Sequence, residues 1–242
     1  MISARGRVLL PAIAAIVAAL AIVVVARGDE PKPMPPRPPR ERPVLLLLSS
    51  LPIVFGEDFS LRQNGSPALS ALESRYRVET ISVADSSDLA KGGLLLMAHP
   101  LAQPAEDLVA LDKWVRDGGR LLLLADPMLE WPSKRPIGDP LRPPSMFMDT
   151  GLLKHWGLRL DAPLERGPRK EKLGRYDVTT VSPGELFGGC RISADRLVAQ
   201  CRIGKGRATV VADADLLETD RLGPLASHNL DGILQELGEL EP

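Results

Sequence analysis

The hydrophobic pattern in the middle of the chain predicts a strand, a helix and a second strand. One apolar run extends from Leu94 to Ala98 and another from Leu121 to Ala125. Between them, Leu108, Leu111 and Val115 recur at three- and four-residue spacing, as on the buried face of a helix. Neither run alternates with polar residues. We therefore expect parallel strands covered on both faces and joined by a right-handed crossover.

The residues upstream continue this alternation of strands and helices. Val44 to Leu48 is apolar throughout and predicts a central strand, and Ser66-Pro67 predicts the start of a helix that runs to Arg75. Tyr76 to Val83 alternates between apolar and polar residues, which indicates an outer strand. The sequence therefore predicts an α/β fold of the flavodoxin-like or class I amidotransferase-like type. Its mostly parallel sheet would have the strand order 2-1-3-4, with helices on both faces.

The pattern becomes irregular after Asp126-Pro127 and then rich in short β segments. Met128 to Pro144 holds five prolines and predicts a surface excursion. The later elements are expected to be a short helix over Phe147 to Trp156, a strand over Leu158 to Leu160, a charged loop over Pro163 to Lys172, a strand over Tyr176 to Val181, short strands about Ile192 and Val198, a strand over Ala208 to Ala212, and a helix from about Leu225 to Leu237.

A membrane segment is predicted near the N-terminus. Val8 to Ala26 carries no charged residue and is long enough to cross the roughly 30 Å hydrocarbon core of a bilayer. A signal peptide is the alternative, because Val24 and Ala26 offer a small-residue cleavage pattern; we favour the uncleaved anchor. Gly28 to Pro43 is rich in proline and is expected to be an extended spacer. The predicted organisation is a tail (1–7), an anchor (8–27), a linker (28–43) and one α/β domain (44–242).

The two cysteines are expected to form a disulfide across a β-hairpin. If Asp195-Arg196 is the turn, Cys190 faces Cys201 and the apolar residues of the ribbon collect on one side. Directly opposed antiparallel residues are close enough for a disulfide, whereas two buried thiols are the alternative in a reducing compartment. The pairing therefore favours an exported domain.

Net charge excludes one class of function. The formal net charge is -1, so the chain lacks the excess of basic residues that accompanies nucleic-acid binding. Aromatic residues make up 4% of the chain, so we expect an aliphatic core.

Several of these stretches also resemble a known family. They are the run that ends in His99-Pro100, the helix with Leu-Asp-x-Trp-Val, the Gly-Gly-Arg that follows it, the run that ends in Asp126-Pro127, and the stretches Gly151 to Ala162 and Gly204 to Leu217. Together they resemble the auxiliary domain of ABC-type transport systems, the gliding-motility-type accessory proteins, over roughly Pro43 to Leu237. The resemblance implies a class I glutamine amidotransferase-like fold without its catalytic residues, an extracytoplasmic location, and a membrane-protein partner such as a transporter permease.

The nucleophile of an amidotransferase is not found where that fold would carry it. Such an enzyme needs a cysteine on a sharp strand-to-helix turn, but Cys190 and Cys201 both lie in the late β region. The sequence also has no G-x-S-x-G motif and no phosphate-binding glycine loop. We therefore expect no catalytic residue, no bound metal and no cofactor.

One constellation of polar residues remains a candidate ligand site. All of these residues except Glu57 are predicted at or just after the carboxyl ends of strands, where open α/β sheets bind ligands, and Glu57 lies in the long connection after the first strand. The alternative is that the aspartates cap turns and helices and that His99 is a turn residue. The candidates are Ser49, Ser50, Glu57, His99, Asp126, Asp213 and Asp215, and His228 could join them.

Two functions follow from these observations. The first is a membrane-tethered, non-catalytic accessory or ligand-sensing domain of an ABC-type transport system or envelope complex, on the outer side of the inner membrane. The second is an amidotransferase-like or metal-dependent hydrolase with a site near His99, Asp126 and Asp215. Positive charges after the predicted anchor favour a cytoplasmic domain, whereas the resemblance and the cysteines favour export, which is the location we expect.

Overall fold

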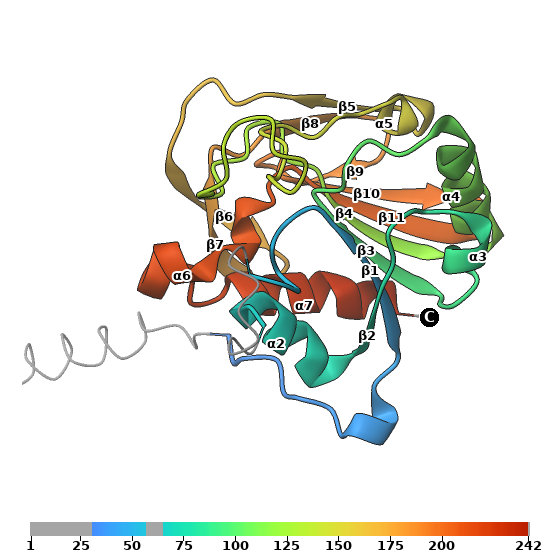
Figure 1. Ribbon diagram of the computed structural model, residues 1–242, viewed down its shortest axis with the longest axis horizontal. Coiled ribbons are helices and arrows are strands. Elements are labelled where there is room, and N and C mark those ends of the chain that lie inside the picture. The colour runs from blue at the N-terminus through green and yellow to red at the C-terminus, as the bar shows by residue number, and fades with distance from the viewer. Residues whose placement is uncertain (1–30, 57–64, 242) are drawn as a thin grey trace, which may run out of the picture. The chain divides into compact units, whose positions relative to one another are not determined.

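A seven-stranded sheet lies at the centre of the part of the chain that the computed structural model describes, residues 31–56 and 65–241 (Figure 1). Its strand order is β2-β1-β3-β4-β11-β10-β9. All neighbouring strands from β2 to β11 are parallel. Strand β10 pairs antiparallel with both β11 and β9. The predicted mostly parallel sheet and its order 2-1-3-4 are confirmed. The strands are β1 (Val44–Ser49), β2 (Arg77–Thr80), β3 (Leu94–Ala98), β4 (Arg120–Leu124), β9 (Arg191–Ile192), β10 (Val198–Ile203) and β11 (Gly206–Val211).

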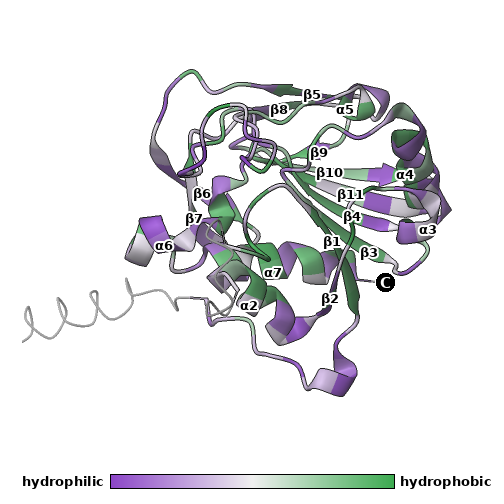
Figure 2. Cartoon of the chain, viewed as in Figure 1, coloured by the Kyte–Doolittle hydropathy of each residue, from purple (hydrophilic) through white to green (hydrophobic). Residues whose placement is uncertain are grey.

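Leucine-rich strands form the core. Leu45, Leu46 and Leu95 have no exposed surface, and Leu121 to Leu124 are equally buried. Figure 2 shows the hydrophobic colour concentrated on the central strands and the hydrophilic colour on outer helices and loops. Because these strands are covered on two faces, they contain no alternating polar positions.

Two long helices flank the sheet on opposite faces. Helix α2 (Pro67–Arg75) starts where predicted, with the Ser66 hydroxyl accepting the Leu69 N–H at 3.1 Å. Helix α4 (Ala105–Asp117) ends at Gly118, whose φ of 128° suits a residue without a Cβ. The chain moves from β1 to β2 in one direction and from β3 to β4 in the other, so right-handed crossovers place α2 and α4 on different faces. Figure 1 shows α2 beside α7, and the short α3 (Ser86–Leu89) beside α4.

Two additional β ribbons lie outside the central sheet. Strand β5 (Leu158–Asp161), which follows the short helix α5 (Leu152–His155), pairs with β8 (Glu185–Gly188). Strand β6 (Pro168–Leu173) pairs with β7 (Tyr176–Val181). The charged loop predicted over Pro163 to Lys172 is therefore wrong from Pro168 onward. Charged residues occupy both faces of β6, so the sequence shows no apolar alternation there, although the strand is fixed by its pairing.

The predicted hairpin and disulfide are confirmed. Strands β9 and β10 pair Ile192 with Ala199, which is the predicted register. Cys190 and Cys201 are disulfide-bonded, with their Cα atoms 4.9 Å apart.

Helix α7 (Asn229–Leu240) closes the described fold. It begins later than the predicted Leu225 because a 3-10 turn occupies the preceding residues. Asn229 joins the helix to β7: its side chain accepts the Thr179 N–H and donates to the Thr179 carbonyl, each at 2.8 Å. The elements between β11 and α7 are η3 (Asp215–Leu217), α6 (Thr219–Leu222) and η4 (Gly223–Ala226).

The proline-rich segment packs against the domain from Met34 onward. The Met34 N–H donates to Asp231 at 2.7 Å, and Arg37 forms an ion pair with Glu241 at 2.9 Å. Arg37 also lies over the ring of Tyr76, 5.5 Å from its centroid. This part of the segment, which includes the 3-10 turn η2 (Pro39–Glu41), is therefore part of the domain rather than a free spacer.

A membrane-spanning helix is not found within the residues that the structure describes. The anchor predicted at Val8 to Ala26 lies outside them.

Candidate functional site

Three aspartates meet at the carboxyl end of the sheet. Asp126 follows β4, Asp213 follows β11, and Asp215 begins η3. Strands β4 and β11 are parallel neighbours, with Leu124 opposite Val211, so their ends lie together. None of the three aspartates has exposed surface. The sequence predicted this placement at the strand ends, and the sheet order brings the three residues into one cluster.

Backbone amides bind the first two aspartates on both carboxylate oxygens. Asp126 accepts the N–H of Met128 at 2.8 Å and that of Ala214 at 2.9 Å. Asp213 accepts the N–H groups of Val181 and Leu216, each at 2.8 Å. These carboxylates therefore tie together the loops after β4 and β11 and the edge of β7.

Asp215 is less completely bonded. Its Oδ2 accepts the Glu130 N–H at 2.8 Å, whereas its Oδ1 makes no hydrogen bond. The nearest cation is Arg221, whose Nη2 lies 3.7 Å from Oδ1 and whose Nε lies 3.4 Å from Glu218.

Burial sets the proton affinity of the cluster. Loss of water raises the pKa of Asp126 to about 6 and that of Asp215 to about 7. The pKa of Asp213 is raised well above its usual value, by burial first and then by the charges of Asp126 and Asp215. Part of this carboxyl cluster is therefore protonated near neutral pH.

His99 makes contacts of its own rather than with the aspartates. It is fully buried, has φ of 47°, and its Nε2 lies 2.8 Å from the Pro144 carbonyl, to which it donates. Its Nδ1 has no partner, and burial lowers the pKa of the ring. His228 stacks on Tyr176, with ring centroids 6.0 Å apart. No hydrogen bond or ion pair links either histidine to the three aspartates. Among the described residues, no three His, Cys, Asp or Glu side chains could hold a metal ion.

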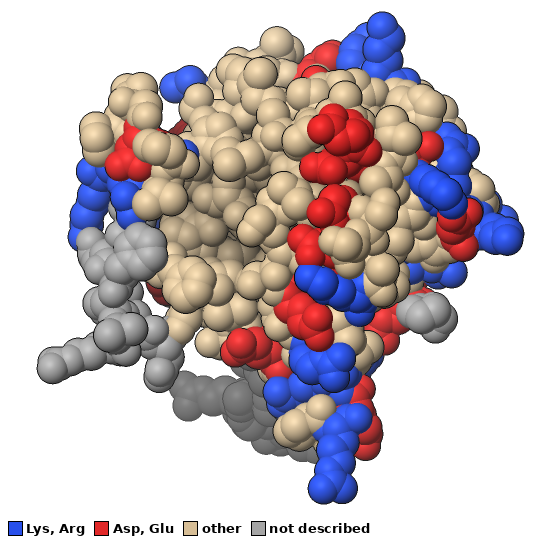
Figure 3. All heavy atoms as spheres, turned by 45° about the vertical axis from the view of Figure 1, so that its right-hand side comes forward, with Lys and Arg blue, Asp and Glu red and all other residues tan. Residues whose placement is uncertain are grey.

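The two candidate serines border a small pocket at the end of β1. Ser49 donates to the Ala98 carbonyl at 3.0 Å, and Ser50 donates to the carbonyl of His99. Both line a pocket of about 280 Å³ together with Phe55 and other residues of the loop after β1. Figure 3 shows a face where mostly uncharged side chains surround a hollow. Glu57, the remaining candidate, lies outside the described residues.

Other polar residues at this edge were not predicted. Ser182 donates its hydroxyl to Glu130 at 2.6 Å, and Glu218 accepts the backbone N–H of Arg221 at 3.2 Å. Glu130 lies in the proline-rich excursion and Ser182 in a turn, where no periodicity marks a buried side. The sequence offered no signal for them beyond their charge or hydroxyl group.

Comparison with solved structures shows the fold. An exo-β-1,4-mannosidase, Op5Man5 from Opitutaceae bacterium strain TAV5, is 15% identical with a TM-score of 0.50; the match covers 81% of this chain and 36% of the mannosidase. Cytoplasmic protein STM3548 from Salmonella typhimurium is 9% identical with a TM-score of 0.50, and the match covers 82% of this chain and 98% of that one. The chain thus spans about a third of the mannosidase and nearly all of the Salmonella protein.

Comparison at the level of sequence families identifies the chain. No curated protein matches it. A family model described as "ABC-type uncharacterized transport system" matches residues 41–167, just over half of the 242 residues. The match covers the β1-to-β4 half of the sheet and the excursion that follows it. The chain belongs to this auxiliary family of ABC-type transport systems.

Proposed function

We propose that the chain is a non-catalytic accessory domain of an ABC-type transport system, tethered to the membrane by Val8 to Ala26. It acts by contacting a membrane-protein partner such as the transporter's permease. The family supports the transport context.

The observation that carries the non-catalytic role is how the strand-end side chains are used. Each oxygen of Asp126 and Asp213 is bonded to a backbone N–H, and Ser49 and Ser50 donate to carbonyl groups. The described residues contain no free cysteine. A catalytic carboxylate or hydroxyl must change its partners during a reaction, whereas these groups would break the fold by doing so.

The same edge of the sheet offers a surface for protein contact. The loops after β1, β3 and β4 expose large apolar side chains that a protein partner could bury. They are Phe55, Leu101, Ile137, Leu141, Met146 and Met148.

A hydrolase is the second proposal, and one observation favours it. The Oδ1 of Asp215 is buried without a hydrogen bond, and burial raises the pKa of this carboxyl to about 7, a value suited to acid-base catalysis. Its site would lie near His99, Asp126 and Asp215.

Partner capture and turnover assays together test the accessory function. The full-length chain, cross-linked in its own cells and purified in mild detergent, is expected to carry a permease or ATPase subunit of an ABC-type system. The same anchor fused to an unrelated domain is the control and should not recover it. Purified protein is also expected to show no glutaminase, esterase or ATPase activity. Turnover abolished by Asp215→Asn, without loss of folding, would establish the hydrolase instead.

The location is tested separately by the state of the disulfide. We propose that the domain lies outside the inner membrane, because a bonded Cys190–Cys201 pair persists in an oxidising compartment. Protein denatured without reductant, with its thiols blocked at cell lysis, is expected to contain no free thiol. Two free thiols would place the domain in a reducing compartment and contradict export.

A further inference from the structure

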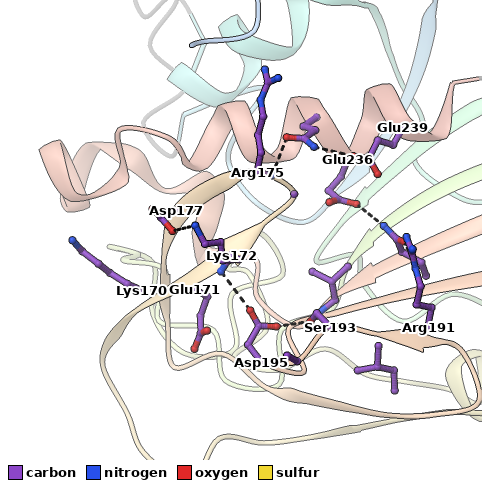
Figure 4. A pocket seen from close by; sticks show the side chains of 16 residues that line it. Lys170, Glu171, Lys172, Arg175, Asp177, Arg191, Ser193, Asp195, Glu236 and Glu239 are labelled. Carbon is purple, nitrogen blue, oxygen red and sulfur yellow. Dashed lines mark hydrogen bonds and ion pairs between the residues drawn. The ribbon is translucent and has the colours of Figure 1, made fainter. Parts of the chain in front are cut away.

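A second pocket shares no lining residue with the one beside Ser49 and Ser50. It is bounded by the β6–β7 hairpin, the β9–β10 hairpin and α7, and it has a volume of about 920 Å³ (Figure 4). This volume is in the range of small-molecule sites. Ile192 and Val198 contribute apolar surface to the pocket, and the remaining lining is mostly polar or charged.

Most basic side chains around this pocket are directed elsewhere. Lys172 forms an ion pair with Asp177 at 2.6 Å, and Arg175 donates to the hydroxyl of Tyr176 at 2.9 Å. Figure 4 shows Lys170 and Arg175 extending away from the hollow. Arg191 instead donates its Nε to Gln200, at 3.1 Å.

Five carboxylates line the pocket, and Lys172 is paired with one of them, Asp177; the other four are Glu171, Asp195, Glu236 and Glu239. The pKa of Glu171 is raised, by burial first and then by the charge of Asp195. Glu239 lies one helical turn from Glu236 on α7. Acidic side chains in the lining therefore outnumber basic ones, five to four.

Glu236 is the least satisfied of these carboxylates. Its residue is 2% exposed, and its one hydrogen bond is a long contact of 3.4 Å from Gln200 Nε2. Arg191 donates its Nε to Gln200 at 3.1 Å instead of forming an ion pair with Glu236. Among the described residues, no Lys, Arg or His nitrogen lies within 4.0 Å of this carboxylate.

An unpaired carboxylate is costly to bury, and a cation from outside can remove that cost where a pocket leads to it. Among the described residues, no group of three His, Cys, Asp or Glu side chains could hold a metal ion. An alkylammonium group fits better, because its three N–H donors can meet separated acceptors and its methylene chain can contact Ile192 and Val198.

We propose that this pocket binds a primary ammonium group carried on an aliphatic chain, with Glu236 as its anionic partner. The ammonium would come from a linear polyamine or from a lysine side chain of a partner polypeptide. Glu239 and the Glu171–Asp195 pair attract the cation, and a second ammonium on the same chain can occupy the latter pair.

Calorimetric titration of the full-length chain in nonionic detergent tests this site. The probes are 1,5-diaminopentane, a lysine-containing tetrapeptide, and the same tetrapeptide with norleucine in place of lysine. Saturable binding of the diamine or the lysine peptide is expected, without binding of the norleucine peptide. Glu236→Gln keeps the side-chain shape and is expected to weaken binding by about tenfold or more. Glu171→Gln is a second variant, expected to weaken binding less.

The matched control is Glu165→Gln, which removes an exposed carboxylate outside the pocket, whose side chain is 85% exposed. It is expected to leave the affinity unchanged. The native affinity should increase from pH 6 to pH 8, because burial and Glu239 raise the pKa of Glu236 to about 7. Glu239 on α7, Arg191 on β9 and Gln200 on β10 act on this group and remain in Glu236→Gln, so that variant should lose most of the pH dependence.

The outcomes are distinct. Preference for the diamine identifies a polyamine as the source of the ammonium, and preference for the lysine peptide identifies a polypeptide; either supports the site. The absence of saturable binding by both amines at millimolar concentration would overturn it. Equal weakening in Glu236→Gln and Glu165→Gln, or displacement of the amine by an equal concentration of Mg²⁺, would also overturn it.

Discussion

Replacing Asp213 with alanine is expected to lower the free energy of unfolding by about 4 kcal/mol. The substitution leaves the buried N–H groups of Val181 and Leu216 without an acceptor, and each such loss costs roughly 1–3 kcal/mol. The substitution also removes the desolvation penalty of the buried carboxyl group, which offsets part of the loss. The expected destabilisation is therefore smaller than the upper limit for two lost hydrogen bonds. Urea unfolding followed by circular dichroism measures the change as a lower transition midpoint.

Two further variants make this prediction specific. Asp213→Asn keeps one acceptor oxygen and is expected to lose about half as much stability. Asp177→Ala, on the exposed face of β7, removes a carboxylate that is 68% exposed and paired with Lys172. It is expected to leave the unfolding midpoint nearly unchanged, because an exposed ion pair contributes little. Native stability in Asp213→Ala would contradict a structural role for this carboxylate.

The stability of the native chain is expected to depend on pH through Asp215. Burial raises the pKa of this carboxyl from 3.8 to about 7, so the folded state retains a proton that the unfolded state loses. The contribution of Asp215 is therefore largest below about pH 4, decreases as pH rises towards 7, and is constant above it. Between pH 5 and pH 8 the decrease amounts to about 3 kcal/mol, at 1.36 kcal/mol per unit.

The measurement compares urea unfolding of the native chain and Asp215→Asn at pH 5 and pH 8. The asparagine variant should lose less stability on going to pH 8, and the difference between the proteins isolates Asp215 from other groups. Asp126 and Glu236 act in the same direction, because burial raises the pKa of each. His99 acts in the opposite direction, since burial lowers its pKa and favours unfolding at acid pH.

Asp177→Asn is the control for this comparison. The hydrogen bond from Lys172 lowers the pKa of Asp177, so the carboxylate stays ionised from pH 5 to pH 8 and its removal should not change the slope. An identical pH dependence in the native chain and Asp215→Asn would show that Asp215 is ionised in the folded protein throughout this range.

The local hydrophobic pattern was sufficient to predict the parallel half of the sheet. Leu94–Ala98 was predicted to the residue, α2 begins and ends where predicted, and α4 contains the apolar positions predicted for a helix. The local sequence is enough to predict such segments, because burial on two faces requires a continuous apolar run and helix ends require particular capping residues. The hairpin register was also predictable, since one alignment separates apolar from polar positions and brings Cys190 opposite Cys201.

The charged strand and the docked proline segment depended on tertiary contacts. Strand β6 has charged residues on both faces, so its structure comes from pairing with β7 rather than from its own pattern. The segment from Met34 is ordered by Asp231, Glu241 and Tyr76, which lie at distant positions in the sequence.

The sequence by itself determined the order of the first four strands and which polar residues stand at the strand ends. The tertiary structure decided what those residues do. Besides the local amides that turns and caps would supply, Asp126 accepts the Ala214 N–H and Asp213 accepts the Val181 N–H, from distant segments. The ring of His99 donates to the Pro144 carbonyl. Periodicity reports which face of an element is buried, whereas hydrogen-bond partners depend on where distant segments meet, and that is fixed when the whole sheet is assembled.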